Sequence, residues 1–178
     1  DFSPSLKADL TMMNGEGYSS LQMDDAFKYA VGLTYSYKDR FINRFYMDYM
    51  KNGIAQSTYT WVSSYTHDNN LNLVFEYNHQ FNNDLSEGKE LYGYSLYGKY
   101  NLTPTYQLFA RYDILRSNAL IEGENPWHLA DDGSMLIAGI QVVPVKGIKI
   151  ALNYQDWVPL AANMSTKSFI FLDMEFRL

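Results

Sequence analysis

Residues 167–178 read KSFIFLDMEFRL, and this stretch decides how the rest of the chain is interpreted. Apolar side chains recur there at every second position: Ile170, Leu172, Met174, Phe176 and Leu178. The positions between them are Phe169, Phe171, Asp173, Glu175 and Arg177. Because successive side chains of a β-strand point to opposite faces, this pattern predicts a strand with one unbroken apolar face. Such a strand needs a neighbour on each side, and in a closed barrel the first strand supplies the second neighbour.

Composition points to an all-β chain with one domain spanning residues 1–178. Aromatic residues make up 16% and hydrophobic residues 47%, yet the mean hydropathy is only -0.31, so the apolar content is spread by alternation. No run approaches the roughly 20 apolar residues of a membrane-spanning helix. The net charge of -6 without a Lys/Arg cluster argues against nucleic acid. The lack of Cys removes disulfides and thiolate sites, and we expect no cofactor and no metal.

Ten segments alternate over about the length that a tilted membrane strand needs, roughly 9–11 residues. They cover residues 5–13, 28–37, 40–51, 57–67, 71–81, 91–102, 106–115, 135–145, 148–157 and 167–178. Asn43 falls on the otherwise apolar side of its segment, which predicts a β-bulge or a slipped phase there.

The connections alternate between short and long. Turn chemistry marks the short ones, at residues 38–39, 69–70, 103–105 and 146–147. Longer polar stretches fill residues 15–25, 53–56, 82–89, 119–133 and 162–166. All short turns then lie on the same side as both chain ends, which is the arrangement of outer-membrane barrels. Ten is an even number, so a complete small barrel is self-consistent, but a fragment of a longer barrel remains open.

The side of each segment opposite the apolar one carries charges of both signs. These candidate pore-lining residues are Lys7, Asp9, Arg44, Asp48, Glu76, Lys99, Arg111, Asp113, Lys149, Asp173, Glu175 and Arg177. In a barrel they would face the lumen, where they set ion preference or pair with one another. In a soluble sandwich, the alternative, they would form a solvated surface.

Aromatic residues gather toward the ends of the segments. The candidate membrane-girdle residues are Tyr35, Tyr37, Tyr65, Tyr100, Tyr106, Tyr112, Tyr154, Trp157 and Phe176. Tyr and Trp rings favour the headgroup level of a bilayer, so two such girdles favour a transmembrane β-barrel over a sandwich.

Roughly the last 75 residues of the chain resemble Gram-negative outer-membrane porins. The residues that carry this resemblance are FARYD at 109–113, Gly139, IKIALNY at 148–154 and the terminal segment. They are most similar to the phosphate-selective porin O and P family. The resemblance implies an outer-membrane location, lipid contact and recognition of the last strand by the barrel-insertion machinery. Full porins of that family have sixteen strands, and their constriction loop would lie upstream of this sequence, so no solute is implied.

Three functions remain open at this stage. The first is a non-enzymatic pore for passive diffusion of small polar or ionic solutes. The second is a plugged structural barrel that anchors a larger assembly, with a homo-oligomer or another outer-membrane protein as partner. The third is a loop-side hydrolase using His128, Asp131 and Asp132, which lie in the longest loop. His67 and Asp68 fall at a short turn, away from such a site.

Overall fold

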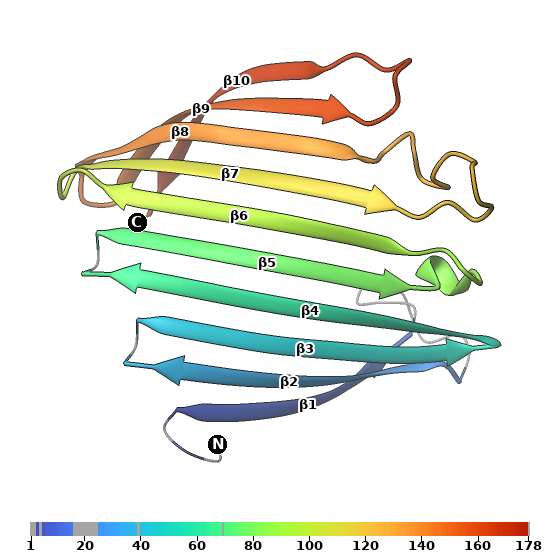
Figure 1. Ribbon diagram of the computed structural model, residues 1–178. Helices are drawn as coiled ribbons and strands as arrows, with labels where there is room; N and C mark the ends of the chain where they lie inside the picture. The colour runs from blue at the N-terminus through green and yellow to red at the C-terminus, as the bar shows by residue number, and fades with distance from the viewer. Residues whose placement is uncertain (1–2, 4, 16–24, 39, 69, 178) are drawn as a thin grey trace.

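The chain folds into one antiparallel sheet whose ten strands follow one another in sequence order (Figure 1). A computed structural model describes residues 3, 5–15, 25–38, 40–68 and 70–177. The strands are β1 (Leu6–Asn14), β2 (Phe27–Tyr37), β3 (Phe41–Asn52), β4 (Ile54–His67), β5 (Leu71–Phe81), β6 (Leu91–Asn101), β7 (Tyr106–Ser117), β8 (Gly133–Val145), β9 (Ile148–Pro159) and β10 (Lys167–Phe176). A 3-10 turn, η1 (Asn83–Leu85), lies between β5 and β6. The predicted all-β, antiparallel architecture is confirmed.

All ten predicted segments are strands, and their ends agree with the predicted ends to within three residues. The shortest strand has 9 residues and the longest 14, against a usual strand length near 5–6. Among the described residues, no helix is long and apolar enough to cross a membrane.

The two ends of the sheet differ in their connections (Figure 1). The short-turn end carries the connections at 38–40, 68–70, 102–105 and 146–147, together with the start of β1 and the end of β10. The loop end carries the longer connections at 82–90, 118–132 and 160–166, together with the end of β1 and the start of β2. The predicted long connection at 53–56 is wrong, because Gly53 alone joins β3 to β4. Gly53 has a φ of +72°, a left-handed conformation that lets the chain reverse in one residue.

The predicted irregularity at Asn43 is also wrong. Its neighbours in the register, Tyr35 and Ser63, follow without a shift, so Asn43 lies on the apolar face near the short-turn end. The register shifts instead between β8 and β9, at Val142 and Val145. Pro144 lies between these residues and has no N–H to donate to the ladder, which explains the break.

The sheet exposes its apolar face. Residues that are directly opposed share a face, and one such row on the apolar face is Leu33, Phe45, Trp61, Tyr77 and Tyr94. Side chains of this face remain open, as in Ile170 at 75% exposure, whereas Asp48 and Asn153 on the opposite, polar face are buried. The sheet order contains no second layer over the apolar face in the described part of the chain. The arrangement is inside-out relative to a soluble sandwich.

The sheet is not closed. Within the described residues β1 pairs with β2 and β10 pairs with β9, and the expected pairing between β1 and β10 is not present. The length and facing of the strands nevertheless fit a barrel.

A charge placed on the apolar face tests its orientation. Leu152 lies near the middle of β9 on this face, whereas Ala151 lies on the polar face opposite Asp173. Arg at the bilayer midplane of a barrel costs about 2–4 kcal/mol. We expect Leu152→Arg to lower the urea midpoint in lipid vesicles, followed by Trp fluorescence, while Ala151→Arg folds like the unmodified chain. A loss confined to Ala151→Arg would contradict this orientation.

Candidate functional site

All twelve predicted pore-lining residues share the polar face. The strand register places eleven of them on this face. Arg177 directly follows β10, two residues after Glu175, and pairs with that carboxylate. Six of the twelve are basic and six are acidic, so their formal charges cancel. The polar face is therefore an ionic wall of mixed sign.

One ion pair spans β1 to β3 across a glycine of β2. Arg44 donates from Nη1 to Asp9 Oδ1 at 2.8 Å and from Nη2 to Asp9 Oδ2 at 3.0 Å, a bidentate arrangement. Arg44 Nη1 also donates to Thr34 Oγ1 at 2.8 Å. A Cβ on Gly32 would collide with both the guanidinium and the carboxylate. Gly32 was not among the predicted site residues, although a glycine inside a strand often marks such a close approach.

A second ionic cluster lies on β9 and β10. Lys149 Nζ lies 3.1 Å from Glu175 Oε2, and Glu175 also pairs with Arg177. Asn153 donates to Asp173 at 2.6 Å. This cluster lies at the same short-turn end as the Asp9–Arg44 pair.

Arg111 and Asp113 pair with each other along β7. Arg111 Nε donates to the two carboxylate oxygens of Asp113 at 2.9 and 2.8 Å. The guanidinium side chain keeps 52% exposure, so it is open to solutes on the polar face. Glu76, a candidate partner at the sequence level, instead accepts a hydrogen bond from Asn78 at 2.6 Å.

A neutral polar stripe on β4 and β5 separates the ionic regions. Thr60 donates to Asn78 at 2.6 Å, and Gln80 donates to Thr58 at 3.2 Å. At the loop end this stripe opens into a cavity of ≈ 510 Å³. Its polar lining residues are Lys28, Asn52, Gln56, Gln80, Asn83 and Asp84. The amide and hydroxyl groups of the stripe can exchange hydrogen bonds with a passing solute, while Lys28 and Asp84 add one charge of each sign to the cavity.

Eight of the nine predicted girdle residues lie on the apolar face, and Trp157 does not. Trp157 is opposed to Lys167 on β10 and to Met135 on β8, which places it on the polar face. A Cβ on Gly133 would come within 2.6 Å of the Trp157 ring, so the indole covers that glycine. Its nearness to the loop end predicted a girdle role. Trp157 lies an even number of residues after Asn153 in β9, so its side chain is on the polar face rather than the apolar face.

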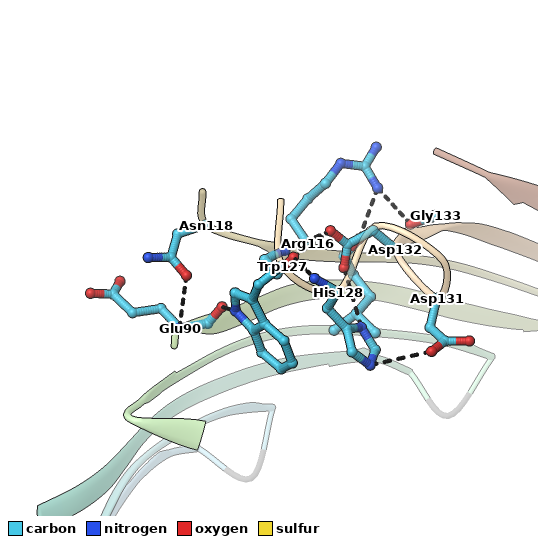
Figure 2. A network of polar contacts seen from close by, with 10 residues as sticks. Glu90, Arg116, Asn118, Trp127, His128, Asp131, Asp132 and Gly133 are labelled. Carbon is cyan, nitrogen blue, oxygen red and sulfur yellow. Dashed lines mark hydrogen bonds and ion pairs between the residues drawn. The ribbon is translucent and has the colours of Figure 1, made fainter. Parts of the chain in front are cut away.

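The longest loop is tied to its neighbour by polar contacts (Figure 2). Trp127 Nε1 donates to the Glu90 carbonyl at 3.1 Å, and Asn118 accepts from the Glu90 N–H at 2.8 Å. The Lys89 ammonium lies 5.0 Å from the centre of the Trp127 ring. These contacts hold loop 118–132 against loop 82–90, and none of the four residues was a predicted site residue.

Asp132 is the buried centre of the same loop (Figure 2). Its Oδ2 accepts from the Ser117 N–H at 3.0 Å and from the Ser117 hydroxyl at 2.7 Å. His128 Nδ1 lies 3.5 Å from Asp132 Oδ1, and His128 Nε2 lies 3.4 Å from Asp131. The carboxylate thus closes the base of the loop.

This arrangement does not favour the loop-side hydrolase. The Ser117 hydroxyl donates to Asp132 and accepts from the His128 backbone N–H, so the imidazole is not positioned as its base. His67 and Asp68 pair at the short-turn end, where Asp68 also pairs with Arg40. Among the described residues, no group of three or more His, Asp or Glu side chains is placed to hold a metal ion.

Long antiparallel strands with an exposed apolar face and an ionic opposite face define the fold class of an outer-membrane β-barrel. Among solved structures, the chain is similar to the NanC porin in a rhombohedral crystal form, with a TM-score of 0.56. The match covers 97% of this chain and 93% of that one at 11% sequence identity, so it shows a porin-like fold. No protein-family model matches the chain, and no curated protein matches it significantly.

Removing the buried carboxylate tests the loop assignment. In Asp132→Ala the Ser117 N–H and hydroxyl lose their acceptor while buried, a loss of about 1–3 kcal/mol. We expect faster proteolysis within loop 118–132 and a lower urea midpoint. Asp131, whose side chain is 75% exposed, is the matched control, and Asp131→Ala should stay within about 0.5 kcal/mol. Equal effects of the two variants would contradict the assignment.

Proposed function

We propose that the chain forms a passive pore for small polar or ionic solutes in the outer membrane of a Gram-negative bacterium. The single observation that carries the proposal is the distribution of side chains over the two faces. The exposed face is apolar, as lipid requires, and the less exposed face carries the mixed charges and the neutral polar stripe. The porin-like fold supports it.

The polar face suits transit of solutes better than tight binding. Several of its acidic and basic residues neutralise one another in pairs, as in Asp9 with Arg44 and Asp113 with Arg111. Local ion pairs of this kind leave a wall without a strong field of one sign, which allows a solute to leave as readily as it enters. The proposed solutes are therefore small and polar, of either charge.

A plugged structural barrel is the second candidate, and a specific observation favours it. Large rings on the polar face would occupy the interior of a narrow barrel: Tyr46, Tyr97, Phe109, Trp157, Phe169 and Phe171. Around eight strands the interior is just filled by side chains, so ten strands leave limited room. In that case the chain would anchor an assembly without conducting.

The proposed surroundings follow from the pore. We infer contact with outer-membrane lipid, recognition of β10 by the barrel-insertion machinery, and association with a second copy or another outer-membrane protein. Membership of the phosphate-selective porin O and P family stays a prediction carried by the FARYD stretch at 109–113 and the strands after it.

Planar-bilayer recording of the refolded chain tests conduction. We expect discrete conductance steps, and Arg111→Glu should raise the permeability of cations relative to anions at least about twofold, because an exposed cation on the wall becomes an anion.

Tyr112→Phe, on the neighbouring position of β7 but on the apolar face, is the matched control and should leave the ion preference unchanged. A folded, membrane-inserted chain that gives no steps would support the plugged barrel instead and end the pore proposal.

A further inference from the structure

No neighbouring strand among the described residues covers the outer edge of β1 or of β10, although Leu6 at the start of β1 exchanges backbone hydrogen bonds with Ser3. In the described part of the chain β1 pairs with β2 and β10 pairs with β9. We propose that these edges pair with each other, with Asp9 directly opposite Arg177, and that the seam joins two ionic clusters into one belt of alternating charge. The occupant of each edge is thus the other edge of the same chain.

Direction and facing limit how the two strands can meet. β1 runs from the short-turn end to the loop end and β10 runs the opposite way, so they would pair antiparallel like the other neighbours. The apolar face of β1 carries Leu10 and Met12, and that of β10 carries Met174 and Phe176. A one-residue slip would turn one apolar face inward, so only every second register is allowed.

Charge complementarity selects among the allowed registers. Asp9 can face Arg177, Glu175 or Asp173, all of which lie on the polar face of β10. Opposite Glu175, two carboxylates meet and Lys7 faces Arg177, so both contacts repel. Opposite Asp173, two carboxylates meet again, while Lys7 faces Glu175, so one repulsive contact accompanies one attractive contact. With Arg177, opposite charges meet, and like charges directly opposed across strands are destabilising.

The selected register completes a network that the open sheet leaves divided. At one edge Arg44 holds Asp9 at 2.8 Å, and at the other Lys149 holds Glu175, which also pairs with Arg177. Joining the edges makes a row of alternating sign: Arg44, Asp9, Arg177, Glu175 and Lys149. All five residues lie at or near the short-turn end of their strands, so the row runs along one level of the wall.

The strand tilt that this register would impose on a closed barrel provides a second argument for it. Following directly opposed residues from strand to strand, a row that starts at Asp9 on β1 ends at Pro159 on β9. Extending the β9–β10 register to Pro159 would place residue 165 opposite it. Arg177 lies twelve residues beyond residue 165. For ten strands with a rise of roughly 3.3 Å and a spacing of about 4.8 Å, a twelve-residue stagger gives a tilt of about 40°.

The competing registers tilt the strands less. A stagger of ten residues, with Asp9 opposite Glu175, gives about 35°, and eight residues, with Asp9 opposite Asp173, give about 29°. Barrels tilt their strands by typically 35–45°, so the charge-selected register is also the one well inside this range. The closed wall would then carry a belt of fixed charge at one mouth of the lumen, whether or not the lumen conducts.

Disulfide trapping tests the seam cleanly, because the chain contains no Cys. The register places Leu10 opposite Phe176 and Met12 opposite Met174 on the apolar face. Opposed Cα atoms lie about 4.5–5.5 Å apart, within disulfide reach, whereas residues offset by two positions lie about 7–8 Å apart. Refolded Leu10→Cys/Phe176→Cys should cross-link within one chain at least about tenfold more than Leu10→Cys/Met174→Cys.

The controls make each outcome decisive. Leu33→Cys/Phe45→Cys, opposed across β2 and β3, is the positive control, and Met12→Cys/Met174→Cys repeats the test if the first pair folds poorly. Adding Arg177→Glu should lower the cross-linking at least about twofold, because two carboxylates would then face each other. Adding Lys167→Glu, at the far end of β10, should leave the cross-linking unchanged. Cross-linking between chains, at another register or at none would overturn the seam, and conductance measured on the same samples would show separately whether the pore survives.

Discussion

Hydrogen bonding of the backbone is the constraint on which this structure depends. In the hydrocarbon of a bilayer no water can satisfy an N–H or C=O group, so a strand there needs a partner on both sides. The inner strands of the sheet meet this condition through antiparallel registers. These registers are continuous in the described residues except between β8 and β9, where the register shifts at Val142 and Val145. That shift lies near the short-turn end, where water can replace the lost partner.

The second requirement is that charges gathered on one face of the sheet compensate one another. Asp9 and Arg44, Asp113 and Arg111, and Glu175 with Lys149 form ion pairs on the polar face. Each pair offsets part of the desolvation cost of its partner, which is large where water is scarce. The loop end is organised differently, since the buried carboxylate of Asp132 accepts hydrogen bonds from the backbone N–H and the hydroxyl of Ser117. One face therefore combines an ionic wall with a mouth of fixed loops.

All ten strands were predictable because side chains alternate between the two faces of a strand, so one residue's face fixes the face of every other residue in that strand. Once Leu10 and Met12 must face lipid, Asp9 and Thr11 must face inward, and the same reasoning holds in every strand. It failed where a local feature replaced the periodicity. Gly53 reverses the chain in one residue, and Asn43 keeps its place in the ladder at a level where a polar side chain is tolerated. The position of Trp157 near the loop end predicted a membrane-girdle residue, but alternation along β9 places its side chain on the polar face.

The sequence by itself determined the strands, their two faces and the set of charges on one of them, because alternation and turn residues are local properties. Only the tertiary structure decided which charges meet. The pairing of Asp9 with Arg44 depends on the registers of β1 with β2 and of β2 with β3, and on the space left by Gly32. The anchoring of the longest loop depends on contacts such as Trp127 with Glu90, which join segments distant in the chain. Such contacts depend on how far neighbouring strands are shifted along one another and on how deeply each residue is buried. The alternation of polar and apolar residues in the sequence specifies neither.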